Sequence, residues 1–191
     1  SNSKKRSLSD CRPAMAVLPV EKDQDPMHES TDVVVIGAGP SGLISAKAIA
    51  KRGLKVTVLE EHAEVGLPSH CAGLVSVDGL SLIGIEPNSC FIQNRVKSAR
   101  FHSPSNLTFE VKARRDMAYV IDRSKFDQYL AREAVENGVK LVLGRSAKTL
   151  NRSEGVIRGI VDDRESILEA SITIDAEGAG GRLLAKSGLK P

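Results

Sequence analysis

The sequence predicts an α/β fold in which parallel strands alternate with helices, and three consecutive features lead to this prediction. The first is a continuous β-branched run at 33–36, as a strand buried on both faces requires. The second is a glycine-rich turn that opens a helical segment at 43–52, which Gly53 ends. The third is a short second strand at 55–59. Because the connection is short and helical, the two strands should be parallel with a right-handed crossover.

Three later segments extend this pattern. Residues 123–137 have the apolar spacing of an amphipathic helix, in which Phe126 and Leu130 face the core. Residues 139–143 form an expected strand that joins the parallel sheet. Residues 155–174 are typical of a β-hairpin that turns at Asp162-Asp163.

The other segments lack such regular patterns. Residues 1–30 contain three prolines and many charges, so we expect a disordered extension before a domain that covers 31–191. Residues 61–90 are interpreted mostly as loop, because Gly, Pro and Ser recur at close intervals. The pattern of residues 91–121 indicates several short strands. Together with the loop before them, these strands are expected to form a region of about 67–118 that is inserted into the domain. The candidate packing residues of these strands are Phe101, Phe109 and Tyr119.

The composition excludes several functional classes. A net charge of +3, without a basic stripe interleaved with aromatics, predicts no nucleic-acid partner. No stretch approaches about 18 uninterrupted apolar residues, so no transmembrane helix is expected. The three cysteines have neither CxxC nor zinc spacing, so no metal site is expected. The odd, sparse set of cysteines suggests a reducing compartment, and no apolar signal-peptide core follows the basic residues at 4–6, so a cytoplasmic protein is expected.

The glycine-rich turn is the motif that carries chemistry. Gly37, Gly39 and Gly42 form G-x-G-x-x-G directly after the first strand, and Pro40 and Ser41 lie between them. Gly37 permits a tight turn, and Gly39 lets a pyrophosphate approach the backbone. Gly42 allows close contact between helix and strand. The helix N-terminus offers N–H groups and the positive end of its dipole to phosphates. A glycine-rich turn without a ligand is the alternative interpretation.

Two acidic residues that follow predicted strands indicate which kind of dinucleotide the glycine-rich turn binds. Glu60 lies 18 residues after Gly42, and its carboxylate is suited to accept hydrogen bonds from both ribose hydroxyls of a dinucleotide. The glycine fingerprint fits FAD and NAD alike. Glu177-Gly178 resembles the Asp-Gly motif of two-dinucleotide flavoproteins, in which the acid binds the ribityl chain, although Glu replaces Asp here. This resemblance favours FAD, and a plain turn after a strand is the alternative.

Taken together, these segments resemble the N-terminal half of the geranylgeranyl reductase family of flavoproteins, in particular the archaeal digeranylgeranylglycerophospholipid reductases. The resemblance covers about residues 31–190. It implies a Rossmann-like FAD-binding domain of the glutathione-reductase type with the beginning of a β-rich substrate domain, in a fragment of a longer protein. The matching segments are 32–60, the Gly-x-Pro-x-x-Cys-x-Gly block at 66–73, the Arg-x-x-Phe-Asp block at 123–127, and 175–183.

The resemblance also implies particular contacts with FAD. Ser41 would contact the phosphates and Glu60 the ribose, while Arg123 would bind near the phosphates or the flavin. The backbone of Ala147 would meet the adenine. The contacts near the flavin would come from Cys71, Ala72 and Gly73. Of these, Cys71 is the candidate for a side chain beside the reacting atoms. No catalytic residue is assigned. The alternatives are that Cys71 is a small buried hydrophobe and that Arg123 simply begins its helix after Asp122.

The function implied by the resemblance is reduction of C=C bonds in geranylgeranyl chains of isoprenoid lipids, with NAD(P)H or a ferredoxin-like protein as electron donor. We expect the fragment alone to be inactive. A flavin monooxygenase of the aromatic hydroxylase type and a truncated, non-catalytic nucleotide-binding module are the alternatives, and the block at 71–73 argues against the hydroxylase. Lys112, Arg114 and Arg115 form either a solvated face or a peripheral contact with anionic head groups on the inner face of the membrane.

Overall fold

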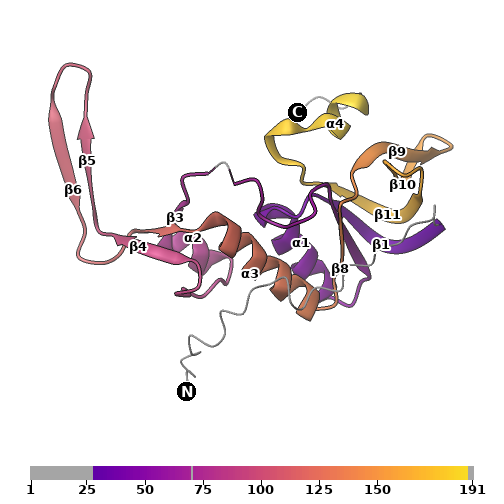
Figure 1. The fold of residues 1–191 in the computed structure, drawn as a ribbon, viewed down its shortest axis with the longest axis horizontal. Coiled ribbons are helices and arrows are strands. Elements are labelled where there is room, and N and C mark those ends of the chain that lie inside the picture. The colour runs from indigo at the N-terminus through magenta and orange to yellow at the C-terminus, as the bar shows by residue number, and fades with distance from the viewer. Residues whose placement is uncertain (1–27, 70, 189–191) are drawn as a thin grey trace. The chain divides into compact units, whose positions relative to one another are not determined.

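The computed structural model describes residues 28–69 and 71–188, so residues 1–27 of the extension expected at 1–30 lie outside the described residues. The described chain forms two compact units. One, which we call the nucleotide unit, consists of 28–67 and 127–188; the other, the inserted unit, consists of 68–126. Figure 1 shows the elements of both units in chain order.

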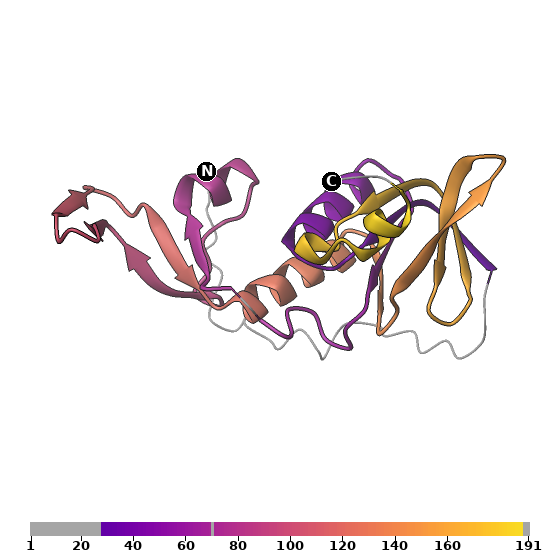
Figure 2. The same cartoon turned by 90° about the horizontal axis from the view of Figure 1, so that it is seen from above.

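The nucleotide unit contains a six-stranded sheet with the strand order β8-β2-β1-β11-β10-β9. The strand β1 pairs in parallel with both β2 and β11, and β2 pairs in parallel with β8. The hairpin of β9 and β10 continues the sheet beyond β11 in antiparallel pairing (Figure 2). The strands are β1 (His28–Ile36), β2 (Val56–Glu60), β8 (Lys140–Leu143), β9 (Ala147–Ser153), β10 (Val156–Asp162) and β11 (Ile167–Asp175).

The helix α1 (Pro40–Ala50) begins directly after the glycine-rich turn. Pro40 stands in its first turn, where a missing N–H removes no helical hydrogen bond. Helix α1 therefore starts three residues earlier than the expected Leu43. The chain turns away at Gly53, whose φ of +86° is readily adopted only by glycine.

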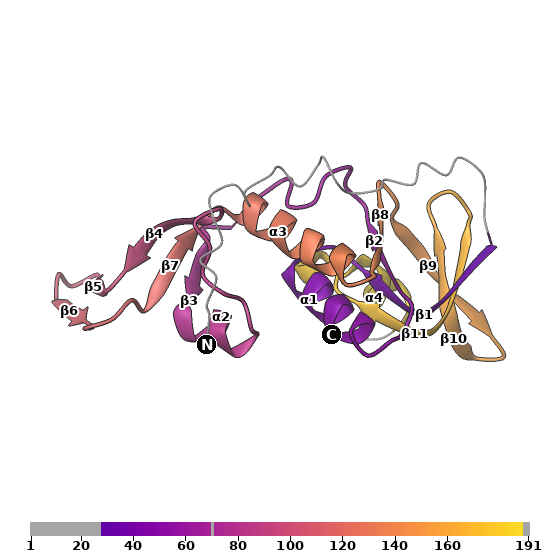
Figure 3. The same ribbon diagram turned by 90° about the horizontal axis from the view of Figure 1, so that it is seen from below.

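The helix α3 (Arg123–Glu136) lies beside α1 in Figure 3. Lys47 Nζ of α1 donates to Glu133 Oε2 of α3 at 2.9 Å. Leu130 and Ala134 of α3 are buried, as their helical spacing predicts. The unit ends with α4 (Arg182–Lys186), which follows the short 3₁₀ helix at Gly178–Gly180.

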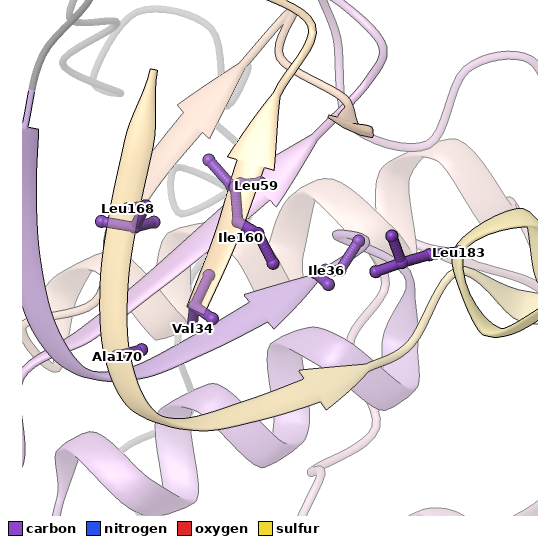
Figure 4. Packing of buried hydrophobic residues seen from close by; sticks show 7 residues of the cluster. All are labelled: Val34, Ile36, Leu59, Ile160, Leu168, Ala170 and Leu183. Carbon is purple, nitrogen blue, oxygen red and sulfur yellow. The ribbon is translucent and has the colours of Figure 1, made fainter. Parts of the chain in front are cut away.

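The parallel strands of the nucleotide unit are buried on both faces. Val34, Ile36 and Leu59 point to one face, where they pack with residues of β10, β11 and α4 (Figure 4). The alternate residues of these strands, such as Val35 and Val58, therefore point to the other face and are also buried. Helix α1 packs against β1 and β2. This double burial explains why the strand at 33–36 has a continuous run of β-branched residues.

The inserted unit is built on a three-stranded antiparallel sheet in the order β3-β7-β4, whose strands lie side by side in Figure 3. Tyr119 of β7 is buried, as expected, and Arg95 of β4 lies over its ring at 5.2 Å from the centroid. Phe91 is 1% exposed and meets Phe126 edge to face at 5.1 Å. The elements are β3 (Leu74–Ser76), α2 (Val77–Leu82), β4 (Ile92–Val96) and β7 (Ala118–Ile121).

The same unit carries a two-stranded ribbon formed by β5 (Ser98–His102) and β6 (Thr108–Lys112). Phe101 and Phe109 are directly opposite in its register, and their rings stack at 4.7 Å. The sequence predicts both as packing residues, yet they remain 49% and 61% exposed. They pack on each other rather than in the buried core of the unit.

Three parts of the expected secondary structure differ from the structure. Strand β1 begins at His28, so residues 28–30 belong to the sheet and not to an extension. Helix α2 lies in the segment interpreted mostly as loop; it has only six residues and is capped by Ser76, whose Oγ accepts from Gly79 N at 3.2 Å. Strand β9 follows Ser146 in a segment without a predicted strand, since its Lys, Arg and Asn residues hide the alternation.

Candidate functional site

The glycine-rich turn joins β1 to α1, and two of its glycines are required by the fold itself. Gly37 has a φ of +101°, and a Cβ there would lie 2.5 Å from the carbonyl oxygen of Ala176. A Cβ on Gly42 would lie 2.0 Å from the carbonyl oxygen of Gly37. These contacts agree with the predicted roles of Gly37 in the tight turn and of Gly42 in close helix packing.

Gly39 has no such structural reason to be glycine. Its φ of −75° and ψ of 176° are accessible to any residue, and a Cβ there would meet nothing within 4 Å. Helix α1, which it precedes, has no side-chain cap and no acid in its first turn, where Pro40 and Ser41 stand. Open space beside an uncapped helix N-terminus fits a pyrophosphate, which a side chain at position 39 would displace.

Glu60 ends β2 with its carboxylate turned toward the glycine-rich turn. Its Oε2 accepts a hydrogen bond from Ala38 N at 2.8 Å. Its Oε1 accepts from His62 N at 3.0 Å and contacts His62 Nδ1 at 2.6 Å. Since a carboxylate has about four lone-pair directions, one remains on Oε2 for a ribose hydroxyl. The second expected ribose bond requires the His62 side chain to move away.

The acid–glycine motif lies against the glycine-rich turn, because β11 runs parallel to β1. Ala176 N donates to Ile36 O at 2.8 Å, immediately before Gly37. Glu177 itself has a structural role, since its Oε2 accepts from Leu183 N at the start of α4, at 2.8 Å. Gly178 is exposed, with a φ of +80° and open space around it. The contact of Glu177 with a ribityl chain therefore remains a prediction, and its role as a cap is an observed one.

The turn between β8 and β9 also adjoins the end of β2. Arg145 N donates to Glu60 O at 2.9 Å, and Gly144 N donates to His62 O at 3.0 Å. Ala147, expected beside the adenine, opens β9 two residues further on and is half-buried. The structure thus brings the glycine-rich turn, Glu60 and this segment together within one unit.

The remaining predicted residues lie in the inserted unit. Cys71 and Ala72 are exposed, so the interpretation of Cys71 as a buried hydrophobe is wrong for this chain. Gly73 has a φ of +71°, and a Cβ there would lie 2.2 Å from Ile121 O. The close approach of β7 therefore explains why position 73 is glycine. Since β3 and β7 are antiparallel, the block at 71–73 and Arg123 meet at one end of this sheet.

Arg123 is half-buried at the start of α3. The preceding Asp122 caps this helix, because its Oδ1 accepts from Lys125 N at 3.0 Å. The helix start therefore explains the sequence around Arg123, while its contact with FAD remains a prediction.

The basic cluster of the inserted unit is partly engaged in ion pairs. Arg115 binds both carboxylate oxygens of Asp78 at 2.7 and 2.9 Å. The hydrogen bond from Arg115 lowers the pKa of the Asp78 carboxyl. Lys112 Nζ lies 3.2 Å from Glu110 Oε2. The peripheral contact with anionic head groups remains a prediction.

Within 28–69 and 71–188, no helix combines the length and apolar character that crossing a membrane demands. The same ranges contain no group of three or more His, Cys, Asp or Glu side chains placed to hold a metal ion.

Two residues of the site are not predicted by the sequence. His62, which contacts the Glu60 carboxylate, has no predicted role, although its position two residues after Glu60 places it within reach. Asp162 is expected in the hairpin turn, but it is 3% exposed and pairs with Arg145. Nothing in the local sequence indicates that pair, because the two residues belong to different elements.

The comparison with protein families gives the class of protein. The model of the FAD-dependent oxidoreductase family matches residues 32–190, and the chain belongs to this family. The match covers the glycine-rich turn, Glu60 and Glu177-Gly178, so FAD rather than NAD is the dinucleotide of this fingerprint.

The individual relatives confirm the narrower resemblance to geranylgeranyl reductases. Digeranylgeranylglycerophospholipid reductase 2 of Methanopyrus kandleri is 37% identical over 163 residues, which are 84% of this chain and 40% of the relative. The corresponding reductase of Methanothrix thermoacetophila is 39% identical over 158 residues, 80% of this chain and 40% of the relative. The chain thus spans about two fifths of the length of these relatives.

A solved structure agrees with these relatives. A geranylgeranyl bacteriochlorophyll reductase-like protein of Thermoplasma acidophilum superimposes with a TM-score of 0.82 and 30% identity. The superposition covers 86% of this chain and 43% of the other. It confirms the predicted FAD-binding, Rossmann-like α/β fold.

Proposed function

We propose that this chain is the FAD-binding part of an enzyme that reduces C=C bonds in the geranylgeranyl chains of isoprenoid lipids. The observation that carries the proposal is sequence identity of 36–39% to digeranylgeranylglycerophospholipid reductases over 158–163 residues. The match to the Thermoplasma acidophilum protein supports the same class.

The nucleotide unit would hold the adenosine and pyrophosphate of FAD. The open space at Gly39 and the uncapped start of α1 suit the pyrophosphate, because backbone N–H groups and the helix dipole stabilise its negative charge. Glu60 would accept a hydrogen bond from the ribose with the free lone pair of Oε2. These residues bind and orient the cofactor and take no part in the reaction.

FAD, once reduced, supplies a hydride for transfer to carbon. The part of the protein beside the flavin has to exclude water and leave room for an apolar chain. We propose Cys71, Ala72 and Gly73 for this wall, since all three are small and uncharged. The electron donor is proposed to be NAD(P)H or a ferredoxin-like protein.

The first experiment measures FAD binding by the purified protein from the quenching of flavin fluorescence. Saturable binding is expected with FAD, together with competition by ADP, which shares the adenosine half. FMN lacks that half and should not compete. A protein that binds no FAD would contradict the cofactor assignment and favour the alternative of a truncated, non-catalytic nucleotide-binding module.

The second experiment tests the reaction itself. Because the relatives are more than twice as long as this chain, it uses the protein encoded by the complete gene, loaded with FAD and reduced by dithionite. Mass spectrometry of added digeranylgeranylglycerophospholipid should show two hydrogens gained for each double bond reduced. An unchanged lipid, together with oxygen consumption on a phenol, would favour the monooxygenase alternative.

A further inference from the structure

The segment 144–147 contacts the backbone around the ribose acid, and its own position is fixed by one side chain. Arg145 N and Gly144 N hold the carbonyl oxygens of Glu60 and His62. These two bonds fix the backbone that carries the Glu60 carboxylate. Whatever fixes Arg145 therefore also fixes the direction in which Glu60 points.

The side chain of Arg145 is anchored on the β10–β11 hairpin. Its Nε donates to Asp162 Oδ2 at 2.7 Å, its Nη2 contacts the same oxygen, and Nη2 also donates to Ser166 Oγ at 2.9 Å. The second oxygen of Asp162 accepts from the backbone N–H groups of Arg164 and Ser166, each at 2.9 Å. Asp162 is 3% exposed and Arg145 is 9% exposed. The pair is thus buried, two N–H groups of the Arg145 guanidinium meet one oxygen of Asp162, and both side chains make further hydrogen bonds.

Stability alone is a weak reason for such a pair. Desolvation of two charges offsets most of their attraction, so an apolar pair of similar volume often holds a fold equally well. An ion pair made by two N–H groups of a planar guanidinium differs from an apolar pair because it fixes direction as well as distance. Direction matters here, since Arg145 carries the N–H that holds Glu60 and lies two residues before Ala147.

We propose that Arg145, held by Asp162 and Ser166, is a positioning residue for the adenosine half of FAD. It aligns the backbone of Glu60 for the ribose and the backbone of Ala147 for the adenine. Arg145 itself contacts neither the ribose nor the adenine in this proposal. This inference rests on the proposed binding of FAD at Glu60.

The test removes the ion pair while keeping the hairpin turn. In the double variant Arg145→Met, Asp162→Asn, both charges are lost, and the Asn side-chain oxygen still accepts from the amides of Arg164 and Ser166. Thermal unfolding without ligand should change little. The dissociation constants for FAD and for ADP should both rise about tenfold or more, the effect expected when one hydrogen bond to a charged group is lost.

The matched control is the exposed pair Lys148–Glu165, which joins β9, three residues after Arg145, to the same β10–β11 hairpin. The double variant Lys148→Met, Glu165→Gln removes the same two charges at the surface. It should bind FAD and ADP with the affinity of the parent protein.

Each outcome decides the proposal. A folded Arg145→Met, Asp162→Asn variant with parental affinity for FAD and ADP would overturn it. If that variant fails to fold, the variant Arg145→Lys is measured instead, because it keeps the positive charge but lacks the planar guanidinium. Weaker binding of both FAD and ADP by Arg145→Lys supports the proposal. Binding of both ligands with parental affinity overturns it. If the parent protein itself binds neither ligand, the cofactor assignment fails, and this inference fails with it.

Discussion

The Glu60 carboxylate accepts a hydrogen bond from the backbone N–H of Ala38 at 2.8 Å, so the end of β2 and the glycine-rich turn after β1 are joined directly. The acid therefore stabilises the turn, in addition to the ribose contact proposed for it. Because β1 and β2 are adjacent parallel strands, their carboxyl ends meet at one edge of the sheet.

Replacement of Glu60 by Ala is expected to weaken FAD binding about ten- to a hundredfold. The reason is the loss of a charge-assisted hydrogen bond worth about 1.5–3 kcal/mol. Fluorescence titration with FAD measures the effect. The neighbouring Glu61, which pairs with Arg182 at the surface, provides the control. Equal binding by the Glu60→Ala and Glu61→Ala variants would show that the ribose is held elsewhere.

The two glycines at positions 37 and 39 should respond oppositely to alanine. Gly37→Ala places a Cβ 2.5 Å from Ala176 O at a φ of +101°, so we expect destabilisation of at least about 1–3 kcal/mol. Gly39→Ala meets no atom and requires no strained φ, so stability should stay the same or rise by about 0.4–1 kcal/mol.

FAD binding separates the two glycines further. Gly39→Ala should weaken binding although the variant is fully folded, because its methyl group fills the space proposed for the pyrophosphate. Urea unfolding without ligand and FAD titration are measured on the same samples. Parental FAD affinity in Gly39→Ala would place the pyrophosphate away from this turn.

Two phenylalanines of the inserted unit allow a matched test of its core. Phe91 is 1% exposed and packs on Phe126, so Phe91→Ala should destabilise the unit by about 3–5 kcal/mol. Phe101 is 49% exposed and stacks only on Phe109, so Phe101→Ala should lose no more than about 1.5 kcal/mol. Chemical denaturation followed by circular dichroism measures both; similar losses would contradict the burial described for Phe91.

The ion pair of Asp78 and Arg115 predicts a dependence of stability on pH. The hydrogen bond from Arg115 holds the pKa of Asp78 below its ordinary value of 3.8. A depressed carboxyl pKa contributes stability above 3.8, and this contribution is lost as the pH falls through the lower pKa of the folded state. Asp78→Asn should therefore lower the urea midpoint at neutral pH but not well below pH 3.8. If the urea midpoints of the parent protein and Asp78→Asn differed by the same amount at both pH values, the Asp78–Arg115 pair would be excluded as the cause of the difference.

The local patterns of the sequence were sufficient for much of the nucleotide unit. The run at 33–36, the glycine spacing and the acid at 60 predict β1, α1 and β2, because their periodicity and turn residues act within a few positions. The strand expected at 139–143 joins the sheet as β8. The hairpin expected at 155–174 is formed by β10 and β11.

The remaining features depend on contacts between distant segments. The pairing of Arg145 with Asp162 and the cap that Glu177 provides for Leu183 exist only once the strands have assembled. Gly73 illustrates the same point: the resemblance places it near the flavin, which remains a prediction, and the structure adds that a Cβ there would lie 2.2 Å from Ile121 O. A glycine in the sequence indicates that a larger side chain would not fit, and only the folded structure shows which neighbouring atom that side chain would meet.

The different surroundings of the three fingerprint glycines have a consequence for other members of the family. Selection for a stable fold acts on positions 37 and 42, where a Cβ would meet backbone. It does not act on position 39, where a Cβ would meet nothing. With the pyrophosphate contact proposed for Gly39, a descendant that stopped using FAD would therefore retain the first and third glycines and lose the second by drift. The identity of the residue at position 39 can thus serve as a record of cofactor use across related genomes.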